Sequence, residues 1–233
     1  MKALFVTGTD TDAGKTFISL GLVSAWRDAG LRVGVMKPSE TGCAEEEGAL
    51  IPADARLLLR ASRAALSVDE VCPYRYRLPM APAEAWAAEG GVEFSIEKTA
   101  ALFKGIGAAH DVTLVEGAGG LLVPFEGART TVDLARALDT PLLIVARIGL
   151  GTINHTWLTV ECARARGAEI VGVVFTRAVD PRIDEPGPDE ARNPGAVARL
   201  AGVPVLGNVP FVEGGDFERV REYVDTAAIL SAL

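Results

Sequence analysis

Short apolar runs rich in Val, Ile and Leu alternate along the chain with longer segments in which apolar residues recur every three or four positions. The short runs predict buried strands, and the longer segments predict amphipathic helices. The predicted strands are Lys2–Val6, Arg32–Lys37, Val112–Val115, Leu142–Ala146, Ile170–Thr176 and Val205–Val209. The predicted helices are Lys15–Ala29, Asp54–Ser62, Ala81–Glu89, Ser95–Ala108, Ile153–Arg166 and Pro194–Ala201.

Strands that alternate with helices from end to end predict an α/β fold. The expected architecture is a doubly wound, mostly parallel sheet with helices on both faces. Neither a repeat of fixed period nor a Ser/Gly/Pro linker divides the sequence, so we expect one domain over residues 1–233. Ser39–Pro52 and Val179–Asn193 lack a periodic pattern and predict long loops. Ligands of such sheets bind beyond the carboxyl ends of the strands, where candidate residues are to be sought.

Size and composition limit the class of protein and the cellular compartment that fit this chain. With 233 residues, 49% of them hydrophobic, the chain has enough apolar surface for a sizeable core and too much for a disordered protein. No apolar stretch reaches the length of about 20 residues that crosses a bilayer, and the chain turns polar at Thr7, before a signal peptide could form. Cys43, Cys72 and Cys162 form no CxxC pair, which favours reduced structural thiols. We therefore expect a soluble, cytoplasmic protein.

The charge of the chain narrows the choice of partners. Its formal net charge of -8 is opposite in sign to that of a general nucleic-acid binder. The C-terminal segment Asp216–Leu233 is mixed in charge and does not form the basic amphipathic helix of a membrane-surface protein. We expect neither nucleic acid nor a membrane as a partner, and an anionic ligand must bind a local site that overrides the overall field.

The segment after the first predicted strand has the pattern of a phosphate-binding loop. It runs from Gly8 to the sequence Gly14-Lys15-Thr16, with five residues between the two glycines instead of the usual four, and leads into a predicted helix. In such loops backbone N–H groups hold phosphate oxygens, the lysine reaches the β- and γ-phosphates, and the threonine hydroxyl binds Mg²⁺. The strand-loop-helix context favours nucleotide binding over a chance Gly-Lys-Thr sequence.

Two further charged residues end predicted strands at the same edge of the sheet. Lys37 ends the second strand, and we interpret it as a second cation on a transferring phosphoryl group; a solvated lysine is the alternative. Glu116 follows the strand Val112–Val115 and can ligate Mg²⁺, while the glycines within Gly117–Gly120 let the backbone approach a ligand. The alternative for Glu116 is an exposed position in a turn.

Two candidates at helix starts remain open. Asp54 opens a predicted helix, where a carboxylate is equally typical of an N-terminal cap and of a ligand site. The segment Gly149–His155 joins a strand to a helix, and its N–H groups could bind an anion or simply form a tight connection with a Thr or Asn cap. Because the chain has two histidines in all, a metal site of several histidines is excluded.

At these positions the sequence resembles the dethiobiotin synthetase family, whose fold is similar to that of phosphate-loop NTPases. The resemblance extends from near residue 3 to near residue 211 and includes the long form of the phosphate loop. The matching segments are Val6–Thr16, Lys37-Pro38 with Thr41-Gly42, Asp54, Pro73-Tyr74, Val115–Gly120 with Pro124, and Leu150–His155.

The resemblance implies an ATP-dependent ligase of biotin synthesis that acts on 7,8-diaminononanoate. One amine takes up CO2 as a carbamate, ATP phosphorylates the carbamate, and the second amine closes a cyclic urea with loss of phosphate. It further implies Mg²⁺ as the cofactor. It also implies a homodimer in which the Gly151–Asn154 helix start of one chain receives the carboxylate of substrate bound mainly by the other chain.

The resemblance also assigns residues to roles. The implied catalytic residues are Lys15, Lys37 and Thr11, and the implied Mg²⁺ ligands are Thr16, Asp54 and Glu116. The implied nucleotide-binding residues are Asp12, Ala13, Gly14, Lys15, Thr16, Phe17, Glu116, Gly119, Thr176 and Pro210. The implied substrate-binding residues are Thr41, Lys37, Gly151, Thr152 and Asn154.

The sequence departs from the family pattern at two places. Ser39-Glu40 stands where small or apolar residues are usual, and Thr176 stands near the position where many members carry an asparagine that binds adenine, which predicts a relaxed choice of base. The alternative function is an ATP-driven switch of the partition or cell-positioning type. Those proteins resemble this fold but carry a lysine where this chain has Thr9. An ATP-dependent amidoligase on a related fold is a third possibility.

Overall fold

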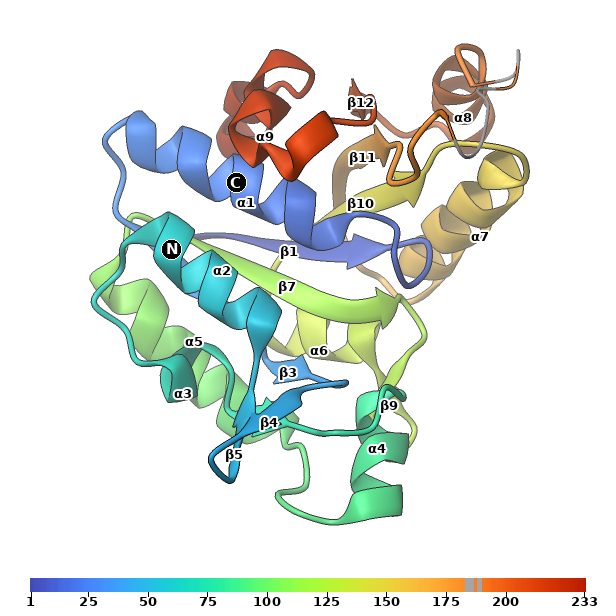
Figure 1. Cartoon of the computed structure of the whole chain (residues 1–233). Coiled ribbons are helices and arrows are strands. Elements are labelled where there is room, and N and C mark those ends of the chain that lie inside the picture. Colours follow the sequence, from blue (N-terminus) through green and yellow to red (C-terminus); the bar gives the residue numbers. More distant parts are fainter. Residues whose placement is uncertain (183–186, 188–189) are drawn as a thin grey trace.

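Six parallel strands form the central sheet of the protein, which we describe from a computed structural model that covers residues 1–182, 187 and 190–233 (Figure 1). The spatial order is β12-β11-β10-β1-β7-β2, with parallel pairing throughout. β1 lies inside the sheet, between β7 and β10, so the chain that leaves its carboxyl end enters the crevice where ligands bind in such sheets. The strands are β1 (Lys2–Gly8), β2 (Val33–Met36), β7 (Val112–Gly120), β10 (Leu142–Arg147), β11 (Ile170–Thr176) and β12 (Val205–Val209).

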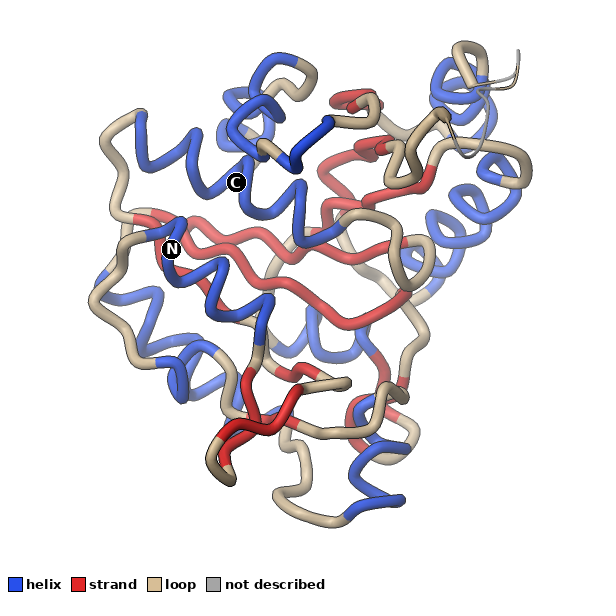
Figure 2. Tube along the Cα trace, in the orientation of Figure 1, coloured by secondary structure: helices blue, strands red, loops and turns tan. Residues whose placement is uncertain are grey.

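Helices cover both faces of this sheet, so the predicted doubly wound α/β class is confirmed (Figure 2). Side chains such as Leu4 and Leu143 pack on one face, and Phe5 and Ile144 on the other, because successive side chains of a strand alternate. The first face carries α1 (Lys15–Asp28), α2 (Ala53–Ser62), α3 (Val68–Val71), the 3-10 turn η2 (Phe217–Glu222) and α9 (Thr226–Ser231). The second face carries α4 (Pro82–Glu89), α5 (Ile96–Ala109), α6 (Thr131–Ala137), α7 (Thr152–Ala165) and α8 (Asn193–Ala201).

The prediction of a loop over Ser39–Pro52 is wrong. Two residues, Ser39–Glu40, form β3, which pairs with β6 (Tyr74–Arg75), and the following residues form a β-hairpin of β4 (Ala44–Glu46) and β5 (Ala49–Ile51). The hairpin turns at Glu47 and Gly48, both with positive φ, as a tight two-residue hairpin requires. Periodicity did not predict it because its residues are mostly exposed on both sides and show no apolar alternation.

The strand that delivers Glu116 is also longer than predicted. β7 continues through Gly117–Gly120 instead of turning, and Gly120 pairs with Gly8 at the end of β1 across a register shift after Val6. A Cβ on Gly117 would lie 2.8 Å from a ring carbon of Phe5, so close packing against the sheet accounts for this glycine. The chain then forms a short hairpin of β8 (Pro124–Glu126) and β9 (Arg129–Thr130).

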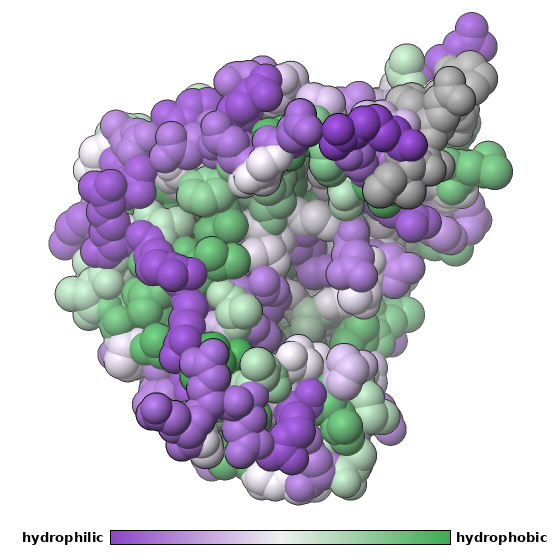
Figure 3. All heavy atoms as spheres, viewed as in Figure 1, coloured by the Kyte–Doolittle hydropathy of each residue, from purple (hydrophilic) through white to green (hydrophobic). Residues whose placement is uncertain are grey.

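In the second predicted loop, Val179–Asn193, residues 183–186 and 188–189 lie outside the described residues. Its last residue, Asn193, begins α8. Among the described residues, no helix is long and apolar enough to cross a membrane. The surface is hollowed near the carboxyl ends of β1 and β7, where the loop after β1 and the β3 segment face each other (Figure 3).

The packing of α1 against η2 makes a direct test of this fold. A Cβ added at Gly21 would lie 2.3 Å from Val220 Cβ, so Gly21→Ala should destabilise the protein by about 1–3 kcal/mol despite the better helix propensity of alanine. Gly105 lies on the exposed side of α5, where an added Cβ meets nothing within 4 Å. Gly105→Ala should therefore stabilise the protein by about 0.5–1 kcal/mol. Chemical denaturation measures both changes, and a Gly21→Ala variant as stable as the natural chain would contradict this packing.

Candidate functional site

The loop after β1 is shaped to present backbone N–H groups. Asp12 and Gly14 both have positive φ, 56° and 90°, which turns the chain sharply before α1 begins at Lys15. Gly14 is the N-cap of α1, and no side-chain hydrogen bond from the described residues caps this helix start. The first-turn N–H groups are therefore left for a ligand, as the phosphate-loop pattern predicts.

Lys15 is folded back over its own loop. Its Nζ donates a hydrogen bond to the carbonyl oxygen of Asp10 at 3.1 Å, and a Cβ on Gly8 would come within 3.1 Å of the same Nζ. Burial and the neighbouring Lys37 ammonium lower the pKa of Lys15 to about 8. These two causes outweigh the nearby Glu116, Asp12 and Asp54 carboxylates, which raise the pKa, and a phosphate placed beside the ammonium would favour its charged form.

Lys37 lies one residue beyond β2 and is buried, so the alternative of a solvated lysine is wrong. Its Nζ donates to Glu116 Oε1 at 2.6 Å, to Asp54 Oδ2 at 3.3 Å and to the carbonyl oxygen of Gly117 at 3.3 Å. Burial alone would lower the pKa of Lys37, but the Glu116 and Asp54 carboxylates outweigh it and raise the pKa above its usual range. Lys37 is thus held as a cation inside the protein.

The three residues predicted to ligate Mg²⁺ converge around this ammonium. Thr16 Oγ1 lies 2.8 Å from Glu116 Oε1 and 3.1 Å from Asp54 Oδ2. Glu116 is fully buried, and its second oxygen, Oε2, has no hydrogen-bond partner among the described residues, so the alternative of an exposed glutamate is wrong. A buried carboxylate oxygen without a partner is costly unless a cation or water meets it.

The donor set fits a metal that is shared with a ligand. No group of three or more His, Cys, Asp or Glu side chains that could hold a metal ion occurs in the part of the chain that the structure describes. Two carboxylates and one hydroxyl are hard oxygen donors, however, and Mg²⁺ is commonly bound by one or two carboxylates together with phosphate oxygens and water. The residues present therefore suit Mg²⁺ bound with a nucleotide.

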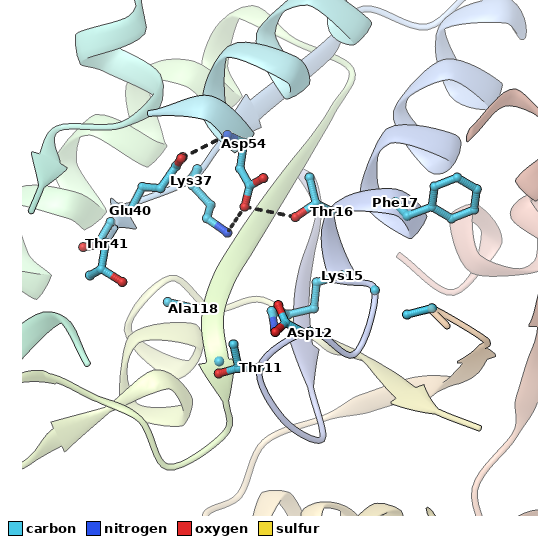
Figure 4. A pocket seen from close by; sticks show the side chains of 14 residues that line it. Thr11, Asp12, Lys15, Thr16, Phe17, Lys37, Glu40, Thr41, Asp54 and Ala118 are labelled. Atoms are coloured by element: carbon cyan, nitrogen blue, oxygen red, sulfur yellow. Dashed lines mark hydrogen bonds and ion pairs between the residues drawn. The ribbon is translucent and has the colours of Figure 1, made fainter. Parts of the chain in front are cut away.

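A cavity of about 440 Å³ connects the loop with these side chains (Figure 4). Thr11, Asp12 and Lys15 lie on one side of it, and Lys37, Glu40 and Thr41 lie on the other. The predicted residues Gly14, Thr16, Phe17, Asp54 and Gly119 also line it, whereas Ala13 and Glu116 are fully buried and do not line it. Lining residues that the sequence did not single out as ligands are Ser39, Glu40, Ala118 and Ala178.

A second cavity of about 260 Å³ adjoins the first where the predicted base-binding residues lie. Thr176 and Pro210 line it together with Phe17, which also lines the larger cavity. A Cβ on Gly14 would lie 2.6 Å from Thr176 Cγ2, so the phosphate loop and the end of β11 touch directly. The structure thus places the predicted phosphate and base residues next to each other.

The predicted substrate-binding residues at the start of α7 do not line the cavity of about 440 Å³. Gly151, with φ of 89°, is the N-cap of α7, and Thr152 and Asn154 lie in its first turn. No side-chain hydrogen bond caps this helix start among the described residues, since the Thr152 hydroxyl instead contacts that of Thr156. The alternative prediction that a Thr or Asn side chain caps this helix is therefore wrong. Within one chain, the α7 start is not brought to the phosphate loop.

Asp54 does not cap α2, so the alternative interpretation of this residue as a helix cap is wrong. The N-cap is Pro52, which has no side-chain oxygen to offer, and the Asp54 carboxylate points toward Lys37 and Thr16. The helix start is instead met by Glu40, whose oxygens accept the N–H groups of Asp54 and Ala55, both at 3.0 Å. Burial raises the pKa of the Glu40 carboxyl. No local sequence pattern indicates this role, because only the fold brings Glu40 to the start of α2.

Comparisons with known proteins show the fold and the family of the chain. A family model described as an AAA domain matches residues 2–219. The solved MinC:MinD cell division protein complex of Aquifex aeolicus has a chain 14% identical to this one, with a TM-score of 0.57 over 99% of this chain and 93% of that chain. The chloroplast FtsY of Physcomitrella patens is 17% identical, with a TM-score of 0.53 over 99% and 64% of the two chains. Identities this low show the fold alone.

Curated relatives are much closer in sequence. The ATP-dependent dethiobiotin synthetase BioD of Anaeromyxobacter sp. is 44% identical over 86% of each chain. The proteins of the same name from Bacillus licheniformis and Bacillus subtilis are 38% and 37% identical, and each alignment covers 100% of this chain and 97% of the relative. The chain therefore belongs to the AAA domain family and to the family of ATP-dependent dethiobiotin synthetases.

Proposed function

We propose that the protein is a MgATP-dependent cyclo-ligase that converts 7,8-diaminononanoate and CO2 into dethiobiotin, with release of ADP and phosphate. The observation that carries this proposal is the meeting of Lys15, Lys37, the Thr16 hydroxyl and the Asp54 carboxylate at one cavity, with the buried Glu116 carboxylate in contact with Lys37 and Thr16. Phosphoryl transfer asks a protein mainly for positioning and charge compensation, and these groups supply both. Family membership supports the choice of substrates.

The chemistry assigns a task to each group. An amine of the substrate adds to CO2 and loses a proton, which gives a carbamate whose oxygen attacks the γ-phosphorus while ADP leaves. The second amine then attacks the carbamoyl carbon and expels phosphate, closing the cyclic urea. Lys15 holds the β- and γ-phosphates, Lys37 faces the oxygens of the transferring group, and Thr11 and Thr41 lie on opposite sides of the cavity as hydrogen-bonding groups.

Thr16, Asp54 and Glu116 are the residues that would hold Mg²⁺. The buried Oε2 of Glu116, which has no partner among the described residues, supports this assignment. The ion would neutralise the charge on the β- and γ-phosphates. In the free protein the Lys37 ammonium compensates part of the negative charge of the Asp54 and Glu116 carboxylates, because it contacts both.

The proposed activity is tested by following ATP consumption and dethiobiotin formation together. Both should require the diamine and bicarbonate, and omission of either should reduce ATP turnover to a small background. ATP hydrolysis that is indifferent to both compounds would contradict the ligase and favour a nucleotide-driven switch.

Replacing either lysine should remove a contact to the transferring phosphoryl group. Lys15→Ala and Lys37→Ala should each lower turnover by at least about 100-fold, the scale of one lost electrostatic contact in a transition state. The matched control is Lys104→Ala on the exposed surface of α5, which should retain full turnover. Because Lys37→Ala leaves Glu116 buried without its cation, rates are compared below the melting transition of each variant. Near-normal turnover of folded Lys37→Ala would show that Lys37 is structural and does not contact the transferring phosphoryl group.

The metal assignment predicts a changed requirement for magnesium. Glu116→Gln and Asp54→Asn each remove a charged oxygen ligand, so both should raise the Mg²⁺ concentration that gives half-maximal activity. Initial rates measured at fixed nucleotide over a range of Mg²⁺ give that concentration. A loss of thermal stability in Asp54→Asn with an unchanged magnesium requirement would show that this carboxylate serves the fold and not the metal.

We further propose a homodimer that completes the substrate site. Apolar side chains lie exposed around the α7 start: Leu150 is 93% exposed, Leu158 61% and Trp157 39%. Asn154, Trp157 and Leu158 are spaced to share one helix face, so a partner that covers the apolar residues would also meet the α7 start. This arrangement would bring the N–H groups at Gly151–Asn154 to the carboxylate of substrate in the other chain.

The dimer is tested by a charge placed on this face. Leu158→Glu should shift the protein to monomers in sedimentation and lower activity per chain, with the larger effect on the KM for the diamine. Leu102→Glu, on α5 and 37% exposed, is the control and should leave assembly unchanged. A fully active natural monomer in sedimentation would overturn the proposal.

A further inference from the structure

Glu40 connects two parts of the chain that carry separate residues of the site. Its backbone is fixed by the β3–β6 pair, and its carbonyl oxygen accepts the Tyr76 N–H at 3.0 Å and the Cys43 thiol at 3.4 Å. Its side chain extends to the first turn of α2, where one carboxylate oxygen accepts the N–H group of Asp54 (Figure 4) and the other accepts that of Ala55. Glu40 is 8% exposed, so this contact is mostly shielded from water.

The start of α2 needs such a partner. A helix leaves its first N–H groups without intrahelical acceptors, and a side chain at the N-cap usually supplies one. Here the N-cap is Pro52, which makes no side-chain hydrogen bond, so Glu40 provides the acceptors from 14 residues before Asp54. A carboxylate suits the place, because the positive end of the helix dipole favours negative charge.

The position of Asp54 follows from this contact. The N–H that Glu40 accepts and the carboxylate that contacts Lys37 and Thr16 belong to the same residue, Asp54. The Asp54 side chain is 37% exposed and opens to the cavity, so packing restrains it less than it restrains the fully buried Glu116. A loosened first turn of α2 would therefore move one proposed metal ligand relative to the others.

We infer that Glu40 is a positioning residue of the magnesium site: it fixes the first turn of α2 and thereby holds Asp54 within reach of the ion. This inference rests on the proposed role of Asp54 as a ligand. A direct contact of Glu40 with a substrate amine is the competing role, since Glu40 also lines the cavity. Both of its oxygens already accept backbone N–H groups, which favours positioning over substrate binding.

Three variants separate these roles. Glu40→Ala removes both acceptors, and Glu40→Gln keeps one carbonyl oxygen but brings an amide against the second N–H group. Ser95→Ala is the matched control, because the Ser95 hydroxyl caps α5 by accepting the Lys98 N–H at 3.3 Å and does not line the cavity. If Glu40→Ala fails to fold, the milder Glu40→Gln still tests the inference.

The first measurement needs no activity. Hydrogen exchange at the Asp54 and Ala55 amides should be faster in both Glu40 variants and unchanged in Ser95→Ala. Binding of Mn²⁺ in the presence of a non-hydrolysable ATP analogue, followed by electron paramagnetic resonance, should weaken by about 10-fold in Glu40→Ala, as expected for an outer partner of a metal ligand, and by less in Glu40→Gln. The Mg²⁺ concentration for half-maximal activity should rise in the same order, while the KM for the diamine at saturating Mg²⁺ stays near its natural value.

A double variant shows whether Glu40 acts through Asp54. If it does, Glu40→Ala combined with Asp54→Asn should bind Mn²⁺ no more weakly than Asp54→Asn alone. Natural Mn²⁺ affinity in Glu40→Ala beside weakened affinity in Asp54→Asn would overturn the positioning role and leave the proposed function intact. A raised KM for the diamine with unchanged Mn²⁺ affinity would also overturn it, in favour of substrate binding. Natural Mn²⁺ affinity in Asp54→Asn would overturn both this inference and the metal assignment.

Discussion

The buried contact between the Lys37 ammonium and the Glu116 carboxylate fixes the geometry of the site. Lys37 follows the end of β2 and Glu116 lies within the neighbouring strand β7, with 2.6 Å between Nζ and Oε1 and almost no exposure to water. Removing one member of such a pair leaves an uncompensated buried charge, which costs about 3–5 kcal/mol. Each partner therefore confines the other, and Asp54 and Thr16 are arranged around the pair.

This arrangement prepares the free protein for a highly charged ligand. Burial and the neighbouring Lys37 ammonium lower the pKa of Lys15, so its charged form is disfavoured in the free protein, and the buried Glu116 has an oxygen without a partner among the described residues. A nucleotide phosphate would stabilise the charged form of Lys15, and a divalent cation would contact the Glu116 oxygen that has no partner. Binding both together neutralises the site, and groups already in place at that point need little reorganisation during the reaction.

The sequence predicted the parts of the molecule that depend on local chemistry. The sheet strands are rich in apolar residues, and the turn from Gly8 to Thr16 has a distinctive residue pattern, so both were predictable. The exposed hairpin over Ala44–Ile51 was missed because it has no apolar face, and the extension of β7 was hidden by its glycines. The role of Glu40 depends on a contact across the fold, which no local pattern encodes.

The central claim is that an oxygen derived from CO2 attacks the γ-phosphorus of ATP in the cavity between Lys15 and Lys37. Turnover with ¹⁸O-labelled bicarbonate, followed by ³¹P magnetic resonance of the released phosphate, tests this most directly. The account predicts that the phosphate acquires one labelled oxygen, because the carbamate oxygen that was phosphorylated leaves with the phosphorus. Phosphate that contains oxygen from water and none from bicarbonate would contradict the account.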